Sequence, residues 1–111
     1  MTINDFLNKY YLHDSLVKNV SSQNNKVELT IDFCFWMQEN YQEKDPETGI
    51  IHMVLPNASI ISGPTGDLDE YSILEVEYHD NCIFLLIMDD FHNLSYEIKI
   101  HSSSNQIELV V

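Results

Sequence analysis

The sequence predicts a mainly β (α+β) fold: an antiparallel β-sandwich or partly open barrel with one short N-terminal helix, in a single domain over residues 1–111. Two observations predict it. After Ser15, apolar and polar side chains alternate with a period of two, which is typical of strands that bury one face. Pairs of Asn and Asp separate these runs, and both residues tolerate the positive φ of tight hairpins.

Residues 3–11 are the segment with helical periodicity. Thr2 precedes them as a candidate N-cap, and Asp5 follows three residues later. Because a helix this short is unstable alone, we expect its apolar face to dock on the rest of the protein. That face holds the residues at spacings i, i+3, i+4, i+7 and i+8, which are Ile3, Phe6, Leu7, Tyr10 and Tyr11.

The later segments alternate as strands. Residues 82–88 are apolar at every position, so we expect a central strand that is covered on both sides. Within it, Leu85 and Ile87 should face one layer, and Phe84 and Leu86 the other. The expected strands are residues 16–20, 27–34, 50–55, 59–62, 74–79, 82–88, 96–101 and 107–111.

Three polar pairs are the predicted turns between strands: Asn24-Asn25, Asp80-Asn81 and Ser104-Asn105. Two longer segments, 38–49 and 63–71, are predicted to be loops. Both are rich in acidic residues, and loops of this size in a small domain are often functional.

The charge of the chain favours some partners over others. Eighteen Asp and Glu stand against five Lys and no Arg, which gives a formal net charge of −13 and a pI near 4.4. A field of this sign repels nucleic acid and anionic membranes, and it attracts basic proteins. We therefore expect a protein partner that is basic, with no nucleic acid and no membrane.

Motifs that bind cofactors or activate nucleophiles are missing from the sequence. It contains no phosphate loop, no dinucleotide fingerprint and no Gly-x-Ser-x-Gly, and its three Gly are too few for a glycine-rich cradle. Without Arg, bidentate clamping of a phosphate is unavailable. We expect no cofactor and no enzymatic activity.

A reducing cytoplasm is the expected compartment. The start of the chain has neither the basic region nor the apolar core of a signal peptide, and no apolar run is long enough to cross a membrane. Cys34 and Cys82 are too few for a disulfide framework, so we expect two buried, reduced thiols.

Two His-containing motifs are candidate metal sites. His13-Asp14 matches the pair of some phosphohydrolases, but the further ligands are missing, so a polar junction between helix and strand is favoured. His79 and Cys82 have the spacing of a zinc half-site, but no second pair completes it. An ordinary cross-strand pair is the favoured interpretation.

Two acidic clusters are candidates for cation binding or catalysis. Residues 67–70 begin like a calcium loop but lack its later Gly and acidic ligand, so a solvated acidic segment is favoured. Asp89, Asp90 and His92 suit acid–base chemistry, and an enzyme or metal-binding protein that uses them is the alternative function. Adjacent strand residues point to opposite faces, however, so the two Asp side chains should not converge.

An aromatic cluster lies next to the first acidic loop. Phe35-Trp36-Met37 is followed by Tyr41, and Trp and Tyr are preferred anchors of protein interfaces. The alternative is that these side chains cap the core at a strand end. The candidate partner-binding residues are Trp36, Tyr41, Glu39, Glu43, Asp45, Glu47, Asp67, Asp69 and Glu70.

Three short motifs carry a resemblance to a known group: Leu12-His13-Asp14-Ser15 after the helix, Ile31-Asp32 leading to Trp36, and Tyr71-Ser72-Ile73-Leu74 before a hairpin. In these motifs the chain resembles small bacterial β-rich domains of unknown function, some of which sit among the immunity proteins of polymorphic toxin systems. The resemblance covers most of the chain in layout. It implies a cytosolic, non-enzymatic binding protein and supplies no catalytic residues.

Overall fold

The computed structural model of the protein describes residues 1–39 and 41–110. Within these residues, eight strands form one antiparallel sheet, and strands make up 61% of the protein. One short helix precedes the sheet, which does not close into a barrel. The predicted mainly β fold with an N-terminal helix is therefore confirmed.

The strands lie close to the predicted positions, with longer ends. They are β1 (Leu16–Gln23), β2 (Lys26–Cys34), β3 (Thr48–Pro56), β4 (Ala58–Ser62), β5 (Gly66–His79), β6 (Cys82–Asp89), β7 (Leu94–Ser102) and β8 (Glu108–Val110). A 3-10 turn, Phe35–Met37, follows β2. The predicted strand 107–111 is observed as β8, and Val111 lies outside the described residues.

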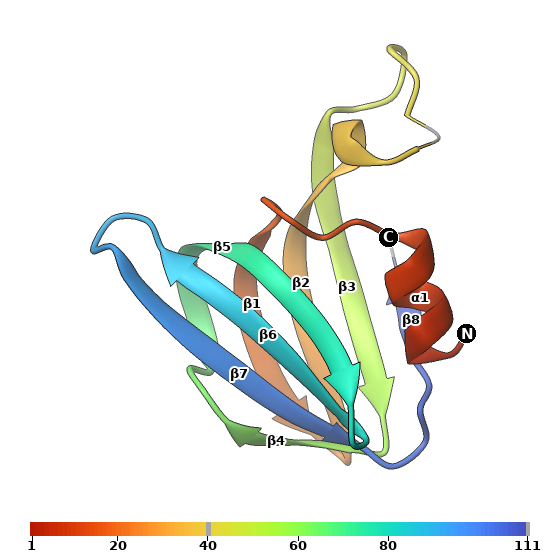
Figure 1. Ribbon diagram of the computed structural model, residues 1–111, viewed down its shortest axis with the longest axis vertical. Coiled ribbons are helices and arrows are strands. Elements are labelled where there is room, and N and C mark those ends of the chain that lie inside the picture. The colour runs from red at the N-terminus through yellow and green to blue at the C-terminus, as the bar shows by residue number, and fades with distance from the viewer. Residues whose placement is uncertain (40, 111) are drawn as a thin grey trace.

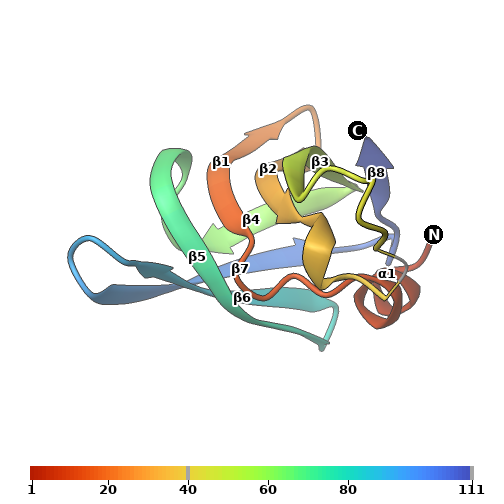
Figure 2. The ribbon, with the colours of Figure 1, turned by 90° about the horizontal axis from the view of Figure 1, so that it is seen from above.

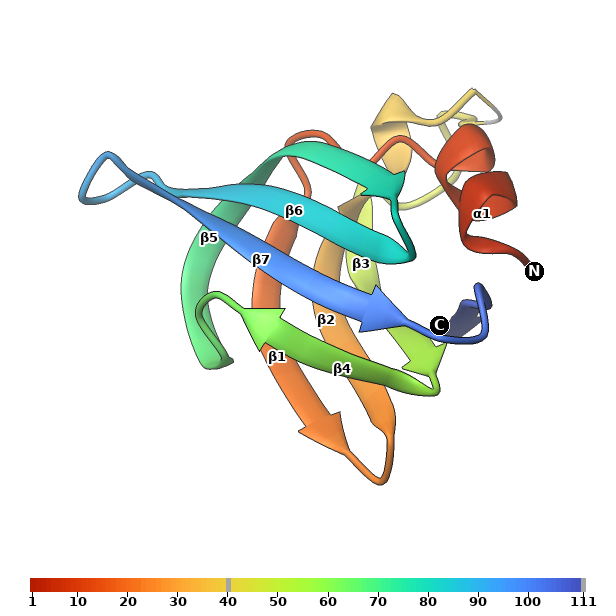
Figure 3. The same ribbon diagram turned by 60° about the horizontal axis from the view of Figure 1, so that its bottom comes forward.

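The sheet has the order β4-β7-β6-β5-β1-β2-β3-β8. Near its centre, Tyr71 of β5 pairs with Val17 of β1 on one side and with Asp89 of β6 on the other. There the sheet turns over, so that β4, β6 and β7 cross in front of β1, β2 and β3 in Figure 3. Figure 2 shows the same curl from above. The apolar faces of the two halves meet in one buried cluster.

Helix α1 (Ile3–Lys9) covers one side of this curled sheet (Figure 1). Thr2 caps it, since its Oγ1 accepts a hydrogen bond from the Asp5 backbone N–H at 3.1 Å. Ile3 is fully buried, and its backbone N–H donates to the Asn105 carbonyl at 3.2 Å. Across residues 1–39 and 41–110, no helix is long and apolar enough to span a membrane.

The helix is shorter than expected. It ends at Lys9 rather than at residue 11, because Tyr10 has an extended backbone with φ −116° and ψ 130°. Phe6 is fully buried as expected, and Tyr10 is half-buried. Tyr11 was expected on the docked face but is 52% exposed, because the chain has already left the helix when it reaches this residue.

Strand β5 corrects the predicted loop at 63–71. It begins at Gly66, so most of that segment is strand. Leu68 is buried, but Glu70 adopts a positive φ of 57°, and the register of the ladder to β1 shifts between Asp67 and Tyr71. A bulge of this kind interrupts the alternation of side chains, which hides the strand from a period-two search.

Strand β6 lies between β5 and β7, as expected for a central strand, but only one of its faces is covered by the core. Leu85 and Ile87 are buried there, while Phe84 and Leu86 alternate with them on the outer face and are half-buried. The Phe84 ring stacks on His79 with centroids 4.4 Å apart. Neighbouring side chains, rather than a second layer, therefore shield the outer face.

The predicted turn chemistry is confirmed at the two tight hairpins. Asn24 and Asn25 have φ of 52° and 63°, and Asp80 and Asn81 have φ of 55° and 62°. Positive φ at both central residues is what a type I′ hairpin requires, and its twist matches that of the flanking strands. Asn105 also has a positive φ, of 54°.

Truncation of Phe6 tests the core. Phe6→Ala should lower the free energy of unfolding by about 3–5 kcal/mol, because a fully buried ring is lost. Phe84→Ala removes the same atoms from the half-buried outer face and should cost about 1 kcal/mol. Urea unfolding followed by circular dichroism measures both values. Equal losses would contradict the one-sided covering of β6.

Candidate functional site

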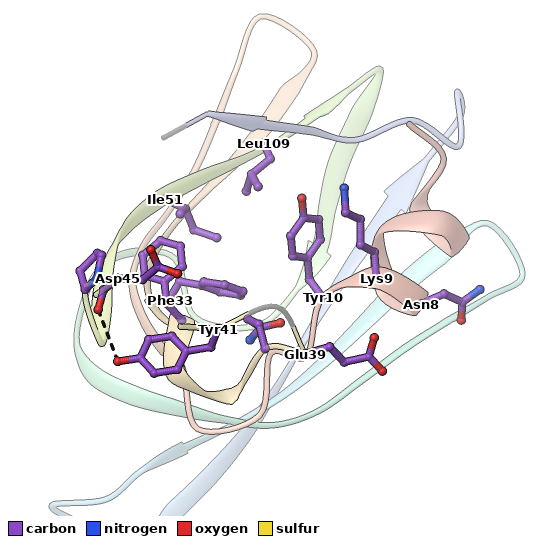
Figure 4. A pocket seen from close by; sticks show the side chains of 12 residues that line it. Asn8, Lys9, Tyr10, Phe33, Glu39, Tyr41, Asp45, Ile51 and Leu109 are labelled. Atoms are coloured by element: carbon purple, nitrogen blue, oxygen red, sulfur yellow. Dashed lines mark hydrogen bonds between the residues drawn. The ribbon is translucent and has the colours of Figure 1, made fainter. Parts of the chain in front are cut away.

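A cavity of about 410 Å³ lies between the end of α1, the loop after β2 and the strands β2, β3 and β8 (Figure 4). We call it the aromatic pocket. Figure 4 shows Tyr10 and Lys9 on one side of it and Phe33 with Tyr41 on the other. Its lining comprises Asn8, Lys9, Tyr10, Phe33, Phe35, Gln38, Glu39, Tyr41, Asp45, Pro46, Ile51 and Leu109.

Three elements supply the aromatic wall. Phe33 lies on the buried face of β2, Phe35 begins the 3-10 turn, and Tyr10 directly follows α1. The Phe33 ring meets Phe35 edge-on at 5.2 Å between centroids and Tyr10 at 6.1 Å. Edge-to-face contacts of this kind stabilise aromatic pairs beyond the area that they bury. The wall is therefore a packed part of the structure.

Gln38 fixes the start of the loop against the segment that follows α1. Its side-chain Oε1 accepts from the Tyr11 backbone N–H at 2.9 Å. Its Nε2 donates to the carbonyls of Tyr11 at 2.8 Å and Cys34 at 2.9 Å. The two bonds to Tyr11 join parts of the chain that are far apart in sequence, and they hold one edge of the pocket.

Charged side chains form the rim. Glu39 and Asp45 bring carboxylates, and Lys9 brings an ammonium whose Nζ lies 5.3 Å from the centroid of the Tyr10 ring. Asp45 also accepts a hydrogen bond from the Gln42 backbone N–H at 3.2 Å, and the Tyr41 hydroxyl donates to the Asp45 carbonyl at 3.4 Å. The pocket thus combines an aromatic interior with carboxylates at its mouth.

Trp36 lies beside this pocket and points largely into solvent. It is 51% exposed, whereas its neighbour Phe35 packs against the core. The Trp36 backbone N–H donates to the Glu47 carbonyl at 3.2 Å, which ties the 3-10 turn to the end of the loop. The idea that this aromatic cluster caps the core therefore holds for Phe35 and is wrong for Trp36.

We call residues 38–47 the acidic loop, of which all but residue 40 are described. Glu39, Glu43, Asp45 and Glu47 are exposed, and Tyr41 is half-buried in the pocket wall. The loop thus gathers these five candidate partner-binding residues next to Trp36.

The remaining candidates, Asp67, Asp69 and Glu70, lie on β5 and not on a loop. Asp67 accepts a hydrogen bond from the Asn19 amide at 2.6 Å, and Lys18 Nζ lies 3.6 Å from Glu70. Figures 1 and 2 place β5 away from the acidic loop. The two acidic segments therefore do not form one joint surface.

Asp89 organises the turn between β6 and β7. It is 6% exposed, and one of its oxygens accepts from the backbone N–H groups of Phe91 at 3.1 Å and His92 at 3.3 Å. His92 Nδ1 lies 2.6 Å from the other oxygen. The hydrogen bond from His92 is the largest cause that lowers the pKa of Asp89 below its usual value, against the effect of desolvation.

Asp90 takes a different direction from Asp89, as expected for adjacent residues at a strand end. Its carboxylate accepts a hydrogen bond from the Ser72 hydroxyl. The Ser72 hydroxyl is thus bonded to Asp90 and not to His92, whose ring contacts Asp89. Asp89 and His92 therefore hold the turn, and Asp90 joins it to β5.

The His-containing motifs have local partners. His13 Nδ1 lies 3.3 Å from the Asp14 carboxylate, and the Asp14 backbone N–H donates to Ile73 where the helix segment meets β5. His79 pairs with Cys82 across the hairpin, as expected. Within residues 1–39 and 41–110, no group of three or more His, Cys, Asp or Glu is placed to hold a metal ion.

The two cysteines are free and buried, as predicted. Cys34 Sγ donates to the Asp14 carbonyl at 3.4 Å, and its backbone N–H donates to Ser15 Oγ at 3.0 Å. Burial is the largest cause that raises the pKa of the Cys34 thiol, so the reactive thiolate is disfavoured. Cys34 therefore acts as a packing residue where β1 meets β2.

Sequence reasoning found three lining residues of the aromatic pocket, Glu39, Tyr41 and Asp45, and missed the other nine. The spacing of Phe33 and Phe35 is a visible signal of an aromatic surface, but it does not indicate that Tyr10 lies opposite them.

No protein-family model, curated protein or solved structure matches the chain.

Acid titration tests the role of Asp89. A carboxyl whose folded-state pKa is lowered contributes stability that is present above the ordinary Asp pKa of about 3.9 and is lost as pH falls through the lower folded-state value. Asp89→Asn should therefore be less stable than the wild type at pH 7, and the difference should shrink below about pH 4. Urea unfolding at several pH values measures it.

Asp80→Asn is the matched control, because Asp80 is an exposed turn residue. It should unfold like the wild type at each pH. A difference between wild type and Asp89→Asn that stays constant down to pH 3 would show that the carboxylate charge of Asp89 is not what holds the turn.

Proposed function

We propose that this protein is a non-enzymatic acidic binding module of the bacterial cytoplasm that captures a basic protein. The most specific version of this proposal is an immunity protein that neutralises a basic toxin. The observation that carries the proposal is Trp36, which is half-exposed at the base of a loop with four exposed carboxylates. Exposed Trp is a favoured anchor of interfaces, and the acidic loop supplies long-range attraction.

The charge of the whole chain also supports capture of a basic protein. A net charge of −13 attracts a basic surface from all sides, while the acidic loop concentrates charge next to the anchor. Such steering raises the rate of association, and the buried aromatic contact sets how long a complex lasts. Fast capture and slow release are the properties that an inhibitor of a toxin requires.

The alternative, an enzyme or metal-binding protein built on Asp89, Asp90 and His92, has less support. The carboxylate of Asp89 already accepts hydrogen bonds from the turn, and that of Asp90 accepts one from Ser72. Both oxygens of the buried Asp89 are therefore engaged within the turn, which leaves less of the cluster available to a substrate or metal.

The proposal is tested first with the partner itself. If a neighbouring gene encodes a toxin with a basic C-terminal domain, that toxin is the candidate partner. Co-expression should protect cells from that toxin, and a sizing column at low salt should show a complex. Loss of both results would remove the immunity interpretation.

Neutralising the acidic loop tests the steering. The variant in which Glu39, Glu43 and Glu47 become Gln and Asp45 becomes Asn should associate with the partner about tenfold more slowly at low salt. Its rate should also depend less on salt, because the steering charges are gone. Stopped-flow or surface-plasmon measurements at several salt concentrations give both quantities.

The matched control neutralises four carboxylates elsewhere: Glu75 and Glu77 on the outer face of β5, Asp80 in the β5–β6 turn and Glu97 on the outer face of β7. Its net charge equals that of the loop variant. If both variants slow association equally, the total charge and not the loop is responsible, and the loop is not the contact surface.

Trp36→Ala should mainly speed dissociation. Loss of an interface anchor costs about 2 kcal/mol or more, which corresponds to a rate roughly 30-fold higher. Unfolding should change by less than about 1 kcal/mol, since half of the side chain is exposed. Phe91→Ala, which removes an aromatic ring that is 89% exposed on the β6–β7 turn, is the control and should leave dissociation unchanged.

A further inference from the structure

We infer that the aromatic pocket is a socket for an arginine side chain of the partner. This inference rests on the proposed function, because it says how the acidic surface recognises a basic protein. Its support is the combination, in one cavity of about 410 Å³, of an aromatic wall and a rim with two carboxylates.

The wall suits a guanidinium. Tyr10, Phe33, Phe35 and Tyr41 line the pocket from different elements. A planar guanidinium is weakly hydrated and stacks on aromatic rings, while the methylene stem of the same side chain packs against apolar groups. Ile51 completes the apolar interior from β3.

The protein itself places a cation on this wall. Lys9 Nζ lies 5.3 Å from the centroid of the Tyr10 ring, within the range of a cation–π contact. The chain contains no arginine, so no guanidinium of its own competes for the pocket. Lys9 also carries a positive charge at the rim, and this charge opposes a second cation there.

The charged residues at the rim favour a ligand with a positive charge. Glu39 and Asp45 attract a cation, and only Lys9 among the lining residues is positive. An anion meets two carboxylates in a protein of net charge −13. A neutral apolar ligand gains nothing from these carboxylates and partly desolvates them, which costs free energy. A cation with an apolar stem satisfies both parts of the pocket.

The position of the pocket favours the side chain of a protein over a free organic cation. Glu39, Tyr41 and Asp45 belong both to the pocket and to the acidic loop, so the mouth of the pocket is continuous with the proposed contact surface. Trp36, at the base of the same loop, would lie at the edge of that contact. A basic protein that docks on the loop therefore brings its side chains to the mouth.

The test uses a fragment and needs no partner. N-acetyl-argininamide is titrated into ¹⁵N-labelled wild-type protein, and backbone amide signals are followed by NMR. A fragment of this size should bind with a Kd of about 1 mM. Shifts should be confined to the pocket lining, the lysine analogue should bind more weakly, and the neutral citrulline analogue should not bind.

Three variants of charged rim residues should change the affinity for the arginine fragment in opposite directions. Glu39→Gln and Asp45→Asn should each weaken binding about threefold, since one carboxylate is lost. Lys9→Gln should tighten it by a similar factor, because a repelling charge is removed. Glu97→Gln, on the outer face of β7, is the control and should not change the Kd. A substitution that merely damaged the pocket would weaken binding, so tighter binding by Lys9→Gln would be an effect of charge.

A short blocked peptide with one arginine between glycines distinguishes the sources of the cation. It should bind at least as well as the fragment. If the fragment binds and the peptide does not, the pocket takes a free small cation, and the partner assignment is overturned. If the amide signals of the pocket lining do not shift at a fragment concentration of roughly twenty times the expected Kd, the proposed arginine site is wrong. In that case, slower partner association in the loop variant would show that protein capture survives by other contacts.

Discussion

Strand β5 hydrogen-bonds on both of its sides at the place where the sheet turns over. Tyr71 and Ser72 pair with β1 on one side and with β6 on the other. A positive φ at Glu70 and a register shift in the ladder to β1, between Asp67 and Tyr71, bend the strand there. Because of this bend, β4, β6 and β7 fold over β1, β2 and β3. A flat sheet of the same strands would leave its apolar faces in water.

Helix α1 covers one side of the curled sheet, and the aromatic pocket lies between the end of the helix, the acidic loop and the sheet. A seven-residue helix is not stable alone, so its position depends on burial of Ile3 and Phe6 against the sheet. Gln38 then joins the loop to the segment after the helix. The pocket is therefore a consequence of packing between elements, and the charges at its rim come from both of them.

The sequence by itself determined the class of fold and most element positions. The alternation in residues 27–34 predicted which side chains of β2 are buried, and Asn24-Asn25 predicted its hairpin with β1. These features are local, because period and turn conformation depend on neighbouring residues. The sequence also determined the acidic charge and the exposed carboxylates of the loop. It did not reveal β5 before residue 74, because the strand there does not follow a simple period of two.

Only the tertiary structure decided which apolar faces pack together and which adjacent side chains point in different directions. Phe35 packs on the core while Trp36, the next residue, is half-exposed, since a 3-10 turn sends adjacent side chains in different directions. Tyr10, Phe33 and Leu109 come from distant parts of the chain and line one pocket. A period of two says that a strand has a buried face but not what covers it. That choice depends on how the sheet curls, and it involves contacts between residues far apart in sequence.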